Sequence, residues 1–257
     1  MRLGFDLDGT LADLQGALAR EALALWPEID PASLPRSAAP DGPPQAKQDE
    51  SREEPAVSIS ALAPHQQREL WTTVCAQTNF WETLDEIEPG ALGRLFELAS
   101  ASRWEVIFLT SRPETAGYTA QHQSHRWLVS YGFLTPSVFV VHGSRGKIAD
   151  ALALDMLVDD RPENCLDVAL DSKARPILVW RDEGKVPGSA RQLGIGAVSS
   201  IAECLDILES VGDGKGNQPG VVDRVKRLLG LTQTVATPAK GQARPLLARA
   251  TEQRGYK

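Results

Sequence analysis

The 257-residue sequence lacks long hydrophobic runs and contains little cysteine. No apolar run approaches the ~20 residues that a membrane-spanning helix needs, so we expect no membrane association. The three cysteines, Cys75, Cys165 and Cys204, form an odd and widely spaced set. This pattern argues against a disulfide framework or a zinc site and favours free thiols in a reducing compartment. The first residues also lack an export signal with a charged and then an apolar stretch. Together these absences predict a cytoplasmic protein.

Positive charge is scarce in most of the chain. The formal net charge is -7, yet residues 211–257 hold nine Lys or Arg against three Asp or Glu, a net of +6. The first 210 residues therefore carry -13, and an acidic body of this kind argues against nucleic-acid binding. We predict that the basic tail, 211–257, is largely disordered, with a short helix at Val221–Leu231. An anionic partner for this tail and simple solvation both remain open.

Five short runs rich in Val, Ile, Leu and Phe predict buried parallel strands. They are approximately Arg2–Phe5, Glu105–Leu109, Ser137–Val141, Met156–Val158 and Pro176–Trp180. Helical patterns lie between them, at about Ala91–Ala99, from Pro113 to Gly132, at Lys147–Leu154 and at Glu163–Ser172. This alternation predicts an α/β fold with a doubly wound, parallel, five-stranded Rossmann-like sheet.

The first two predicted strands are separated by about 100 residues, which is far more than a simple crossover needs. Helical patterns occur in this stretch at Asp13–Ala24 and Pro64–Ala76. Between them, residues from about 31 to 57 include six prolines and show no hydrophobic periodicity, which predicts a disordered segment or surface loop. We therefore predict a core domain formed by 1–12 and 86–210, with a small helical cap, 13–85, inserted after the first strand.

The first predicted strand ends in "FDLDGT", residues 5–10. Residues two apart in a strand point the same way, so Asp6 and Asp8 should emerge together. Two crowded carboxylates need a proton or a cation between them. Mg²⁺ is suited to this place because it prefers oxygen ligands and binds substrate phosphates. The alternative interpretation is an Asx turn that only ends the strand.

Three further motifs are predicted at the same edge of the sheet, where open α/β sheets bind ligands. "VIFLTSRP" supplies Thr110 and Ser111, which could bind phosphate oxygens or cap the next helix. "LVDDRPEN" supplies Asp159 and Asp160, and we favour Asp159 as the direct metal ligand, with Asp160 behind it. Lys147 in "GSRGKIAD" could neutralise phosphate charge at a helix start, or be an ordinary surface lysine.

These four motifs, in this order, resemble those of the haloacid dehalogenase (HAD) superfamily, most of whose members are phosphatases. The match runs from about Arg2 to Trp180. The resemblance implies an aspartyl-phosphate mechanism, with Asp6 as nucleophile and Asp8 as general acid and then base. It implies that Asp6 and Asp159, with the backbone carbonyl of Asp8, hold Mg²⁺, and that Thr110 and Lys147 bind the phosphoryl group. The helical insertion matches the family's cap position.

A narrower resemblance concerns the 5'(3')-deoxyribonucleotidase group, which cleaves nucleoside monophosphates. "LDGTLADL", "NFWETLDEIEPGAL", "LTSRP" and "VDDRPEN" are similar to that group. Phe80 and Trp81 could then stack on a nucleobase, or they could fill the core of the cap. Arg112 could clamp the phosphate bidentately, or pair with Glu114.

The sequence thus predicts a Mg²⁺-dependent phosphomonoester hydrolase, with a nucleoside 5'-monophosphate as the first substrate to test. The expected partner is a small phosphorylated metabolite, and a homodimer is left open. One alternative keeps the mechanism and changes the substrate to a sugar phosphate or another small phosphate ester. Another alternative is a non-catalytic or signalling phosphate-binding module. A signalling receiver fits poorly, because the third predicted strand ends near His142 without an aspartate.

Overall fold

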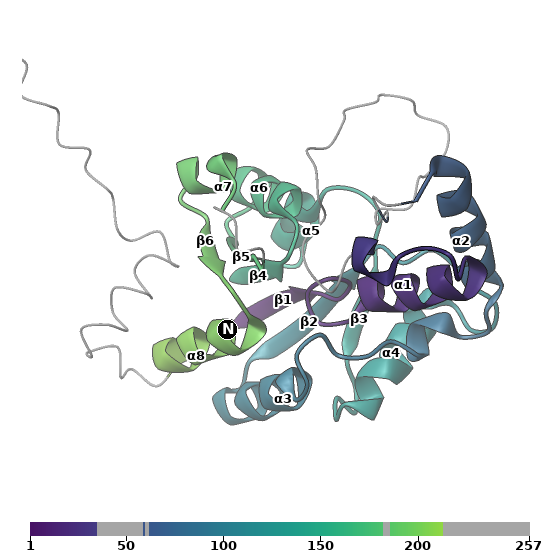
Figure 1. Cartoon of the computed structure of the whole chain (residues 1–257). Coiled ribbons are helices and arrows are strands. Elements are labelled where there is room, and N and C mark those ends of the chain that lie inside the picture. The colour runs from purple at the N-terminus through teal and green to yellow at the C-terminus, as the bar shows by residue number, and fades with distance from the viewer. Residues whose placement is uncertain (35–58, 60–61, 182–185, 213–257) are drawn as a thin grey trace, which may run out of the picture.

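A computed structural model describes residues 1–34, 59, 62–181 and 186–212 (Figure 1). The strands are β1 (Arg2–Asp6), β2 (Glu105–Thr110), β3 (Ser137–Val140), β4 (Met156–Asp159), β5 (Arg175–Val179) and β6 (Gly196–Val198). The helices are α1 (Leu14–Leu25), α2 (Pro64–Ala76), α3 (Ala91–Ser102), α4 (Ala120–Ser130), α5 (Arg145–Ala151), α6 (Pro162–Asp171), α7 (Gly188–Gln192) and α8 (Ile201–Gly212). Two 3₁₀ turns are η1 (Pro31–Ser33) and η2 (Phe80–Glu82).

The strands form one parallel sheet in the order β3-β2-β1-β4-β5-β6. The predicted α/β class and its five strands are confirmed, but the predicted strand number was one too low. β6 has only three residues, too few to show a hydrophobic pattern in the sequence. β1 lies between β2 and β4, so the three strands that end in the acidic and hydroxyl motifs are neighbours in the sheet.

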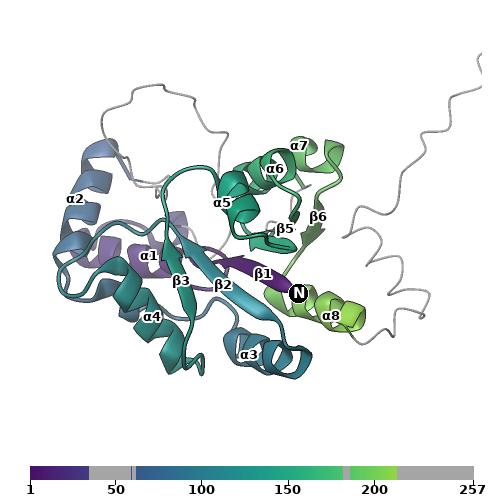
Figure 2. The ribbon, with the colours of Figure 1, turned by 180° about the vertical axis from the view of Figure 1, so that it is seen from behind.

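Helices cover both faces of the sheet (Figures 1 and 2). α3, α4 and α8 lie on one side, and α5, α6 and α7 lie on the other. Successive strand residues point to opposite faces. On β2, Phe108 belongs to one buried cluster and packs against the ring of Phe133, whereas the next residue, Leu109, belongs to another buried cluster that includes Leu157. This double burial explains why the strands read as continuous apolar runs.

The helix after β2 begins later than predicted. Pro113 was expected to start it, but α4 begins at Ala120, with the Thr119 hydroxyl accepting a hydrogen bond from the N–H of His122. The intervening loop is tied to Asn79 instead, whose N–H donates to the carbonyl of Ala116 (2.7 Å). The predicted stop at Gly132 is confirmed, since its φ of 103° favours glycine.

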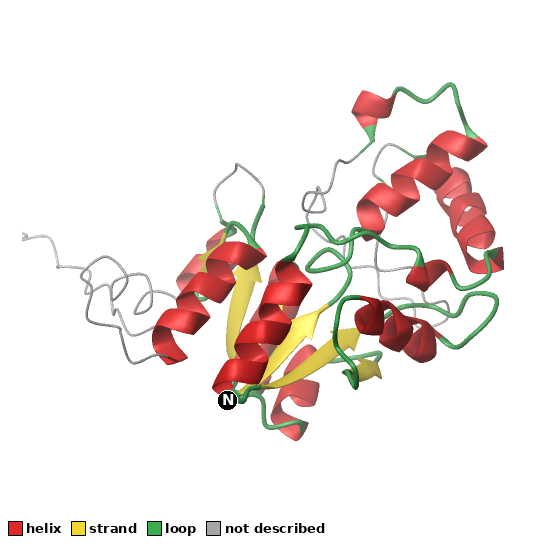
Figure 3. Cartoon of the chain, turned by 90° about the horizontal axis from the view of Figure 1, so that it is seen from below, coloured by secondary structure: helices red, strands yellow, loops and turns green. Residues whose placement is uncertain are grey.

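The predicted helices of the insertion, Asp13–Ala24 and Pro64–Ala76, correspond to α1 and α2. The strand arrows point toward the side of the molecule on which these two helices lie (Figures 1 and 3). Leu18 of α1 and Val74 of α2 belong to the same buried cluster as Phe108 of the sheet, so one core joins the insertion to the sheet. The division into core 1–12 and 86–210 and cap 13–85 stays a prediction.

Two predicted segments lie largely outside the described residues. The proline-rich stretch begins within them as η1, with Leu34 buried, and continues outside them. The basic tail from 213 onward, including the predicted helix at Val221–Leu231, also lies outside. The three cysteines are free, as predicted. Within the described part of the chain, no helix has the length and hydropathy required to cross a bilayer.

Glu88, in the loop before α3, binds the first turn of α8. Its carboxylate accepts hydrogen bonds from the N–H groups of Ile201 (2.8 Å) and Ala202 (2.9 Å) and from Arg181 (2.8 Å). Burial alone would raise the pKa of Glu88, but these hydrogen bonds outweigh it and lower the pKa below its ordinary value of 4.5. The ionised carboxylate therefore stabilises the fold.

We predict that Glu88→Gln lowers the free energy of unfolding by about 1–2 kcal/mol at neutral pH. The amide NH₂ would face backbone N–H donors, and Arg181 would lose its counter-charge. Because the folded-state pKa is lowered, the contribution is present above pH 4.5 and is lost as the pH falls through the folded-state value. Urea denaturation at neutral and acid pH measures this. A difference between wild type and variant that does not shrink in acid would contradict it.

Candidate active site

The loop that follows β1, at the carboxyl edge of the sheet, turns sharply at Gly9. Gly9 has a φ of 87°, and a Cβ atom there would lie 2.2 Å from Oδ2 of Asp160. Only glycine therefore fits between the two acidic motifs. The Arg181 guanidinium donates to the carbonyls of Gly9 (2.7 Å) and Thr10 (3.0 Å) and fixes the loop from the other side.

Asp6, the last residue of β1, is buried and lies against Arg145. Nη2 of Arg145 donates to Oδ1 of Asp6 (3.1 Å) and to the Ser111 hydroxyl (3.1 Å). Nε of Arg145 lies 4.0 Å from Oδ2 of Asp159. Burial raises the pKa of Asp6 well above its ordinary value of 3.8, the charge of Asp159 raises it further, and Arg145 opposes both effects. Asp6 thus sits among acidic neighbours with one cation in contact.

Asp8, two residues further, accepts hydrogen bonds from a different set of side chains. The Thr110 hydroxyl donates to Oδ2 (2.8 Å). Arg112 donates from Nε to both carboxylate oxygens (3.0 and 2.9 Å) and from Nη2 to Oδ1 (2.7 Å). The predicted alternative pairing of Arg112 with Glu114 is thus replaced by a pairing with Asp8.

The two aspartates that end β4 have separate partners. Asp159 is fully buried, and its carboxylate accepts from the Asn164 amide (2.9 and 3.1 Å) and the Arg161 N–H (2.8 Å). Burial raises the pKa of Asp159 above 3.8, and Arg145 opposes it. Asp160 accepts from the Thr10 hydroxyl (3.2 Å). Burial and the charge of Asp159 raise the pKa of Asp160 to about 7.

The structure does not bring Lys147 to this site. Its side chain is exposed, and its backbone N–H donates to the Ser144 hydroxyl at the N-cap of α5. Arg145, the first residue of α5, points to Asp6 instead and is 5% exposed. Residues two apart on a helix differ by about 200°, so only one of the two can face the sheet edge. The motif "GSRGK" contains both Arg145 and Lys147, and the position at which α5 begins determines which of the two faces Asp6.

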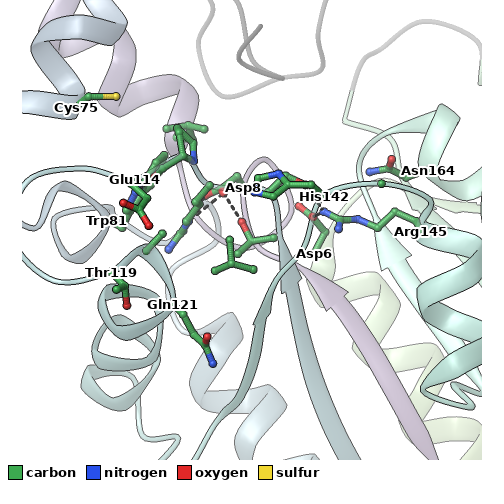
Figure 4. Close-up of a pocket in the computed structure, with 18 of the residues that line it drawn as sticks. Asp6, Asp8, Cys75, Trp81, Glu114, Thr119, Gln121, His142, Arg145 and Asn164 are labelled. Atoms are coloured by element: carbon green, nitrogen blue, oxygen red, sulfur yellow. Dashed lines mark hydrogen bonds and ion pairs between the residues drawn. The ribbon is translucent and has the colours of Figure 1, made fainter. Parts of the chain in front are cut away.

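A cavity of about 940 Å³ opens beside these groups. In Figure 4, Asp8 lies between Asp6 with Arg145 on one side and Trp81 with Glu114 on the other. Thr110, Ser111, Arg112 and Arg161 also line it. Several other lining residues besides Arg145 were not predicted from the sequence, among them His142 and Asn164. Only Asn164 had a local signal, since "DDRPEN" places it one helical turn after the aspartates.

The two predicted stacking residues are core residues. Phe80 is buried in edge contact with Trp81, with ring centroids 5.1 Å apart, and it does not line the cavity. Trp81 lines it but is 0% exposed, and its indole N–H donates to the carbonyl of Pro113 (3.0 Å). The short turn η2 buries both rings against α4, so neither offers a free face to a base.

The fold implies a Mg²⁺ ion, and the oxygen atoms at this edge of the sheet are its candidate ligands. In the described ranges, no three His, Cys, Asp or Glu side chains form a group that could hold a metal ion. The arrangement implied by the resemblance needs only two carboxylates, Asp6 and Asp159, with the carbonyl of Asp8. The side chains of Asp8 and Asp160 were also predicted as ligands, and all four carboxylates accept hydrogen bonds from protein donors. Asp6 and Asp159 are oxygen donors crowded by like charge, and they fit a hard divalent cation.

No protein-family model matches the sequence, and no curated protein is significantly similar to it. The fold does match solved structures. A HAD family hydrolase of Deinococcus radiodurans, crystallised with bound phosphate and sodium, matches with a TM-score of 0.51 at 13% identity, over 82% of this chain and 96% of that one. A hydrolase of Pseudomonas syringae matches with a TM-score of 0.48 at 15% identity, over 82% and 99%. The first of these matches shows that the chain has the Rossmann-like core fold of a HAD family hydrolase.

Proposed function

We propose that this protein is a phosphomonoester hydrolase that works through a phosphorylated Asp6. One observation carries the proposal: Asp6, Asp8, Thr110 and Arg145 line a single cavity at the carboxyl edge of the sheet. Asp6 and Asp8 come from β1 and the loop after it, whereas Thr110 and Arg145 come from β2 and α5, which are distant in sequence. Phosphoryl transfer needs this combination of a positioned nucleophile and charge neutralisation.

Each step assigns a role to a residue in the cavity. A carboxylate oxygen of Asp6 attacks the phosphorus, the bond from phosphorus to the ester oxygen breaks, and protonated Asp8 gives its proton to the departing alcohol. Water then attacks the phosphorus of the acyl phosphate and gives a proton to the Asp8 carboxylate. The bond between phosphorus and Asp6 breaks, which releases inorganic phosphate and restores both aspartates. General acid–base assistance of this kind contributes typically ~10²–10⁴-fold.

Two groups would offset the phosphate charge. Arg145 lines the cavity and contacts Asp6, so its guanidinium would bind the phosphoryl oxygens there. Ser111 lies beside it and accepts from the same guanidinium. Mg²⁺ held by Asp6, Asp159 and the carbonyl of Asp8 would supply further electrostatic stabilisation of the phosphoryl group.

A nucleoside 5'-monophosphate is the substrate that we propose first. The cavity volume is within the range of small-molecule sites, roughly 300–1,000 Å³. Its wall away from Asp6 combines apolar residues with polar ones at the end of the loop before α4. These residues are Leu14, Trp71, Cys75, Glu114, Thr119 and Gln121. An apolar wall with a few polar groups suits a base and ribose better than a sugar alone.

Phosphate release tests the activity and the substrate class together. We expect the purified protein with Mg²⁺ to release phosphate from nucleoside 5'-monophosphates, and to lose this activity when the ion is removed with a chelator. A panel of nucleotides and sugar phosphates at equal concentration measures kcat/KM for each. Phosphate release from a sugar phosphate alone would overturn the nucleotide assignment and keep the chemistry. No release from any ester would overturn both.

A further inference from the structure

Arg112 is held by a cage of side chains beside the cavity. Its side chain is 0% exposed, and its Cζ lies 4.9 Å from the ring centroid of Trp81 and 5.8 Å from that of Trp127. Nη1 donates to the Ser124 hydroxyl (2.9 Å), which in turn donates to the carbonyl of Ala120 (2.7 Å). Because close-packed indoles surround it, the guanidinium cannot move without repacking of η2 against α4.

The buried guanidinium has Asp8 as its ion-pair partner. Two nitrogens of Arg112 contact both oxygens of Asp8, at 2.7–3.0 Å, which is a bidentate arrangement. Asp8 is 12% exposed and lines the cavity. In this ion pair, Arg112 is held in place by its surroundings, whereas Asp8 is the member that lies in the cavity and would reach the reacting atoms. The ion pair sets where the Asp8 carboxylate lies.

Arg112 differs in this respect from Arg145. Each nitrogen of Arg112 already donates to a protein oxygen, two nitrogens to Asp8 and the third to Ser124. In Arg145, by contrast, Nε has no hydrogen-bond partner within the described chain. Three of the five N–H donors of Arg112 thus hold protein oxygens, which favours an orienting role over the predicted role as a phosphate clamp.

We propose that Arg112 is a positioning residue, which holds Asp8 where it exchanges protons with the leaving alcohol and with water. This inference rests on the proposed function. Arg112 would act on the proton-transfer step and leave phosphate binding unchanged. A guanidinium is suited to this task because its planar fork sets the orientation of a carboxylate, which a lysine cannot do.

The test compares two leaving groups. An alkyl phosphate needs a proton on its departing alcohol, whereas p-nitrophenyl phosphate loses a stabilised phenolate that needs none. We would measure kcat/KM with Mg²⁺ for both esters, using wild type, Asp8→Asn, Arg112→Lys and the double variant. The matched control is Arg94→Lys, because Arg94 also forms ion pairs, with Asp206 and Glu209, but does not line the cavity.

We expect Arg112→Lys to lower kcat/KM about 10–10²-fold more for the alkyl ester than for p-nitrophenyl phosphate. Asp8→Asn should change the two esters in the same direction. KM for the aryl ester should stay unchanged. In the Asp8→Asn background, the additional loss from Arg112→Lys should be small, because its effect passes through Asp8. Arg94→Lys should behave as wild type.

Other outcomes overturn the positioning role. Equal losses with both esters and a raised KM would show that Arg112 binds the phosphate. Equal losses with a lowered melting temperature would show a structural role only. If Arg112→Lys fails to fold, Ser124→Ala serves as the second variant, because it keeps both charges of the ion pair. It should give a smaller loss of kcat/KM that is again greater for the alkyl ester than for p-nitrophenyl phosphate. If wild type hydrolyses neither ester, the proposed function fails as well. If wild type and Asp8→Asn behave as expected but Arg112→Lys has the activity of wild type, only the positioning role fails.

Discussion

Asp6→Asn should abolish phosphate release while leaving the fold intact. An amide oxygen is a poor nucleophile and cannot form a stable acyl phosphate. We expect a loss of at least ~10⁴-fold, which is comparable to the loss of a nucleophile in other covalent mechanisms. The carboxylate is crowded by Asp159, Asp160 and Asp8, so a neutral side chain of the same shape should not destabilise the protein greatly.

Steady-state phosphate release and a melting curve together measure this result. Asp206→Asn is the matched control, since Asp206 pairs with Arg94 on the surface and should keep full activity. Mass spectrometry of acid-quenched wild type should find one phosphoryl group on the peptide that contains Asp6, and none in the variant. An Asp6→Asn protein with full activity would refute the nucleophile assignment.

Arg145→Ala is predicted to have the second largest effect. Its guanidinium contacts Asp6 and Ser111 and lies near Asp159, so its removal takes away the cation that contacts the acidic cluster and one of the two proposed counter-charges of the phosphate. We expect kcat/KM to fall by about 10²–10³. Arg145→Lys should recover part of this loss, since it keeps the charge but not the fork geometry.

Lys147→Ala is the natural comparison, because the sequence pattern alone favoured that lysine. Its side chain is exposed on the same helix, so its loss should change kcat/KM by less than about twofold, as expected for a screened surface charge. If Lys147→Ala loses as much activity as Arg145→Ala, the helix start is placed wrongly and the prediction from the sequence holds. Measurements at two salt concentrations would separate screening from direct contact.

The pattern of apolar runs was sufficient for the α/β class and for five of the six strands. Buried parallel strands are hydrophobic on both faces, and this leaves a clear signal even in runs of four residues. The same signal failed for β6, because its three residues, Gly-Ala-Val, include only one of the residue types that mark buried strands. It also placed the start of α4 at Pro113, where tertiary contacts with Asn79 hold the chain as a loop.

At the site, the sequence by itself determined which strand ends carry acidic and hydroxyl groups, because strand direction and the rule for parallel sheets place them at one edge. Asp6, Asp8, Thr110 and Ser111 therefore line one cavity, with Asp159 buried behind it. Only the tertiary structure decided the partners of these groups. Arg145 rather than Lys147 faces Asp6, and Arg112 pairs with Asp8, because helix phase and the packing of two tryptophans depend on distant residues. Neither the helix phase nor this packing can be predicted from the spacing of nearby residues in the sequence.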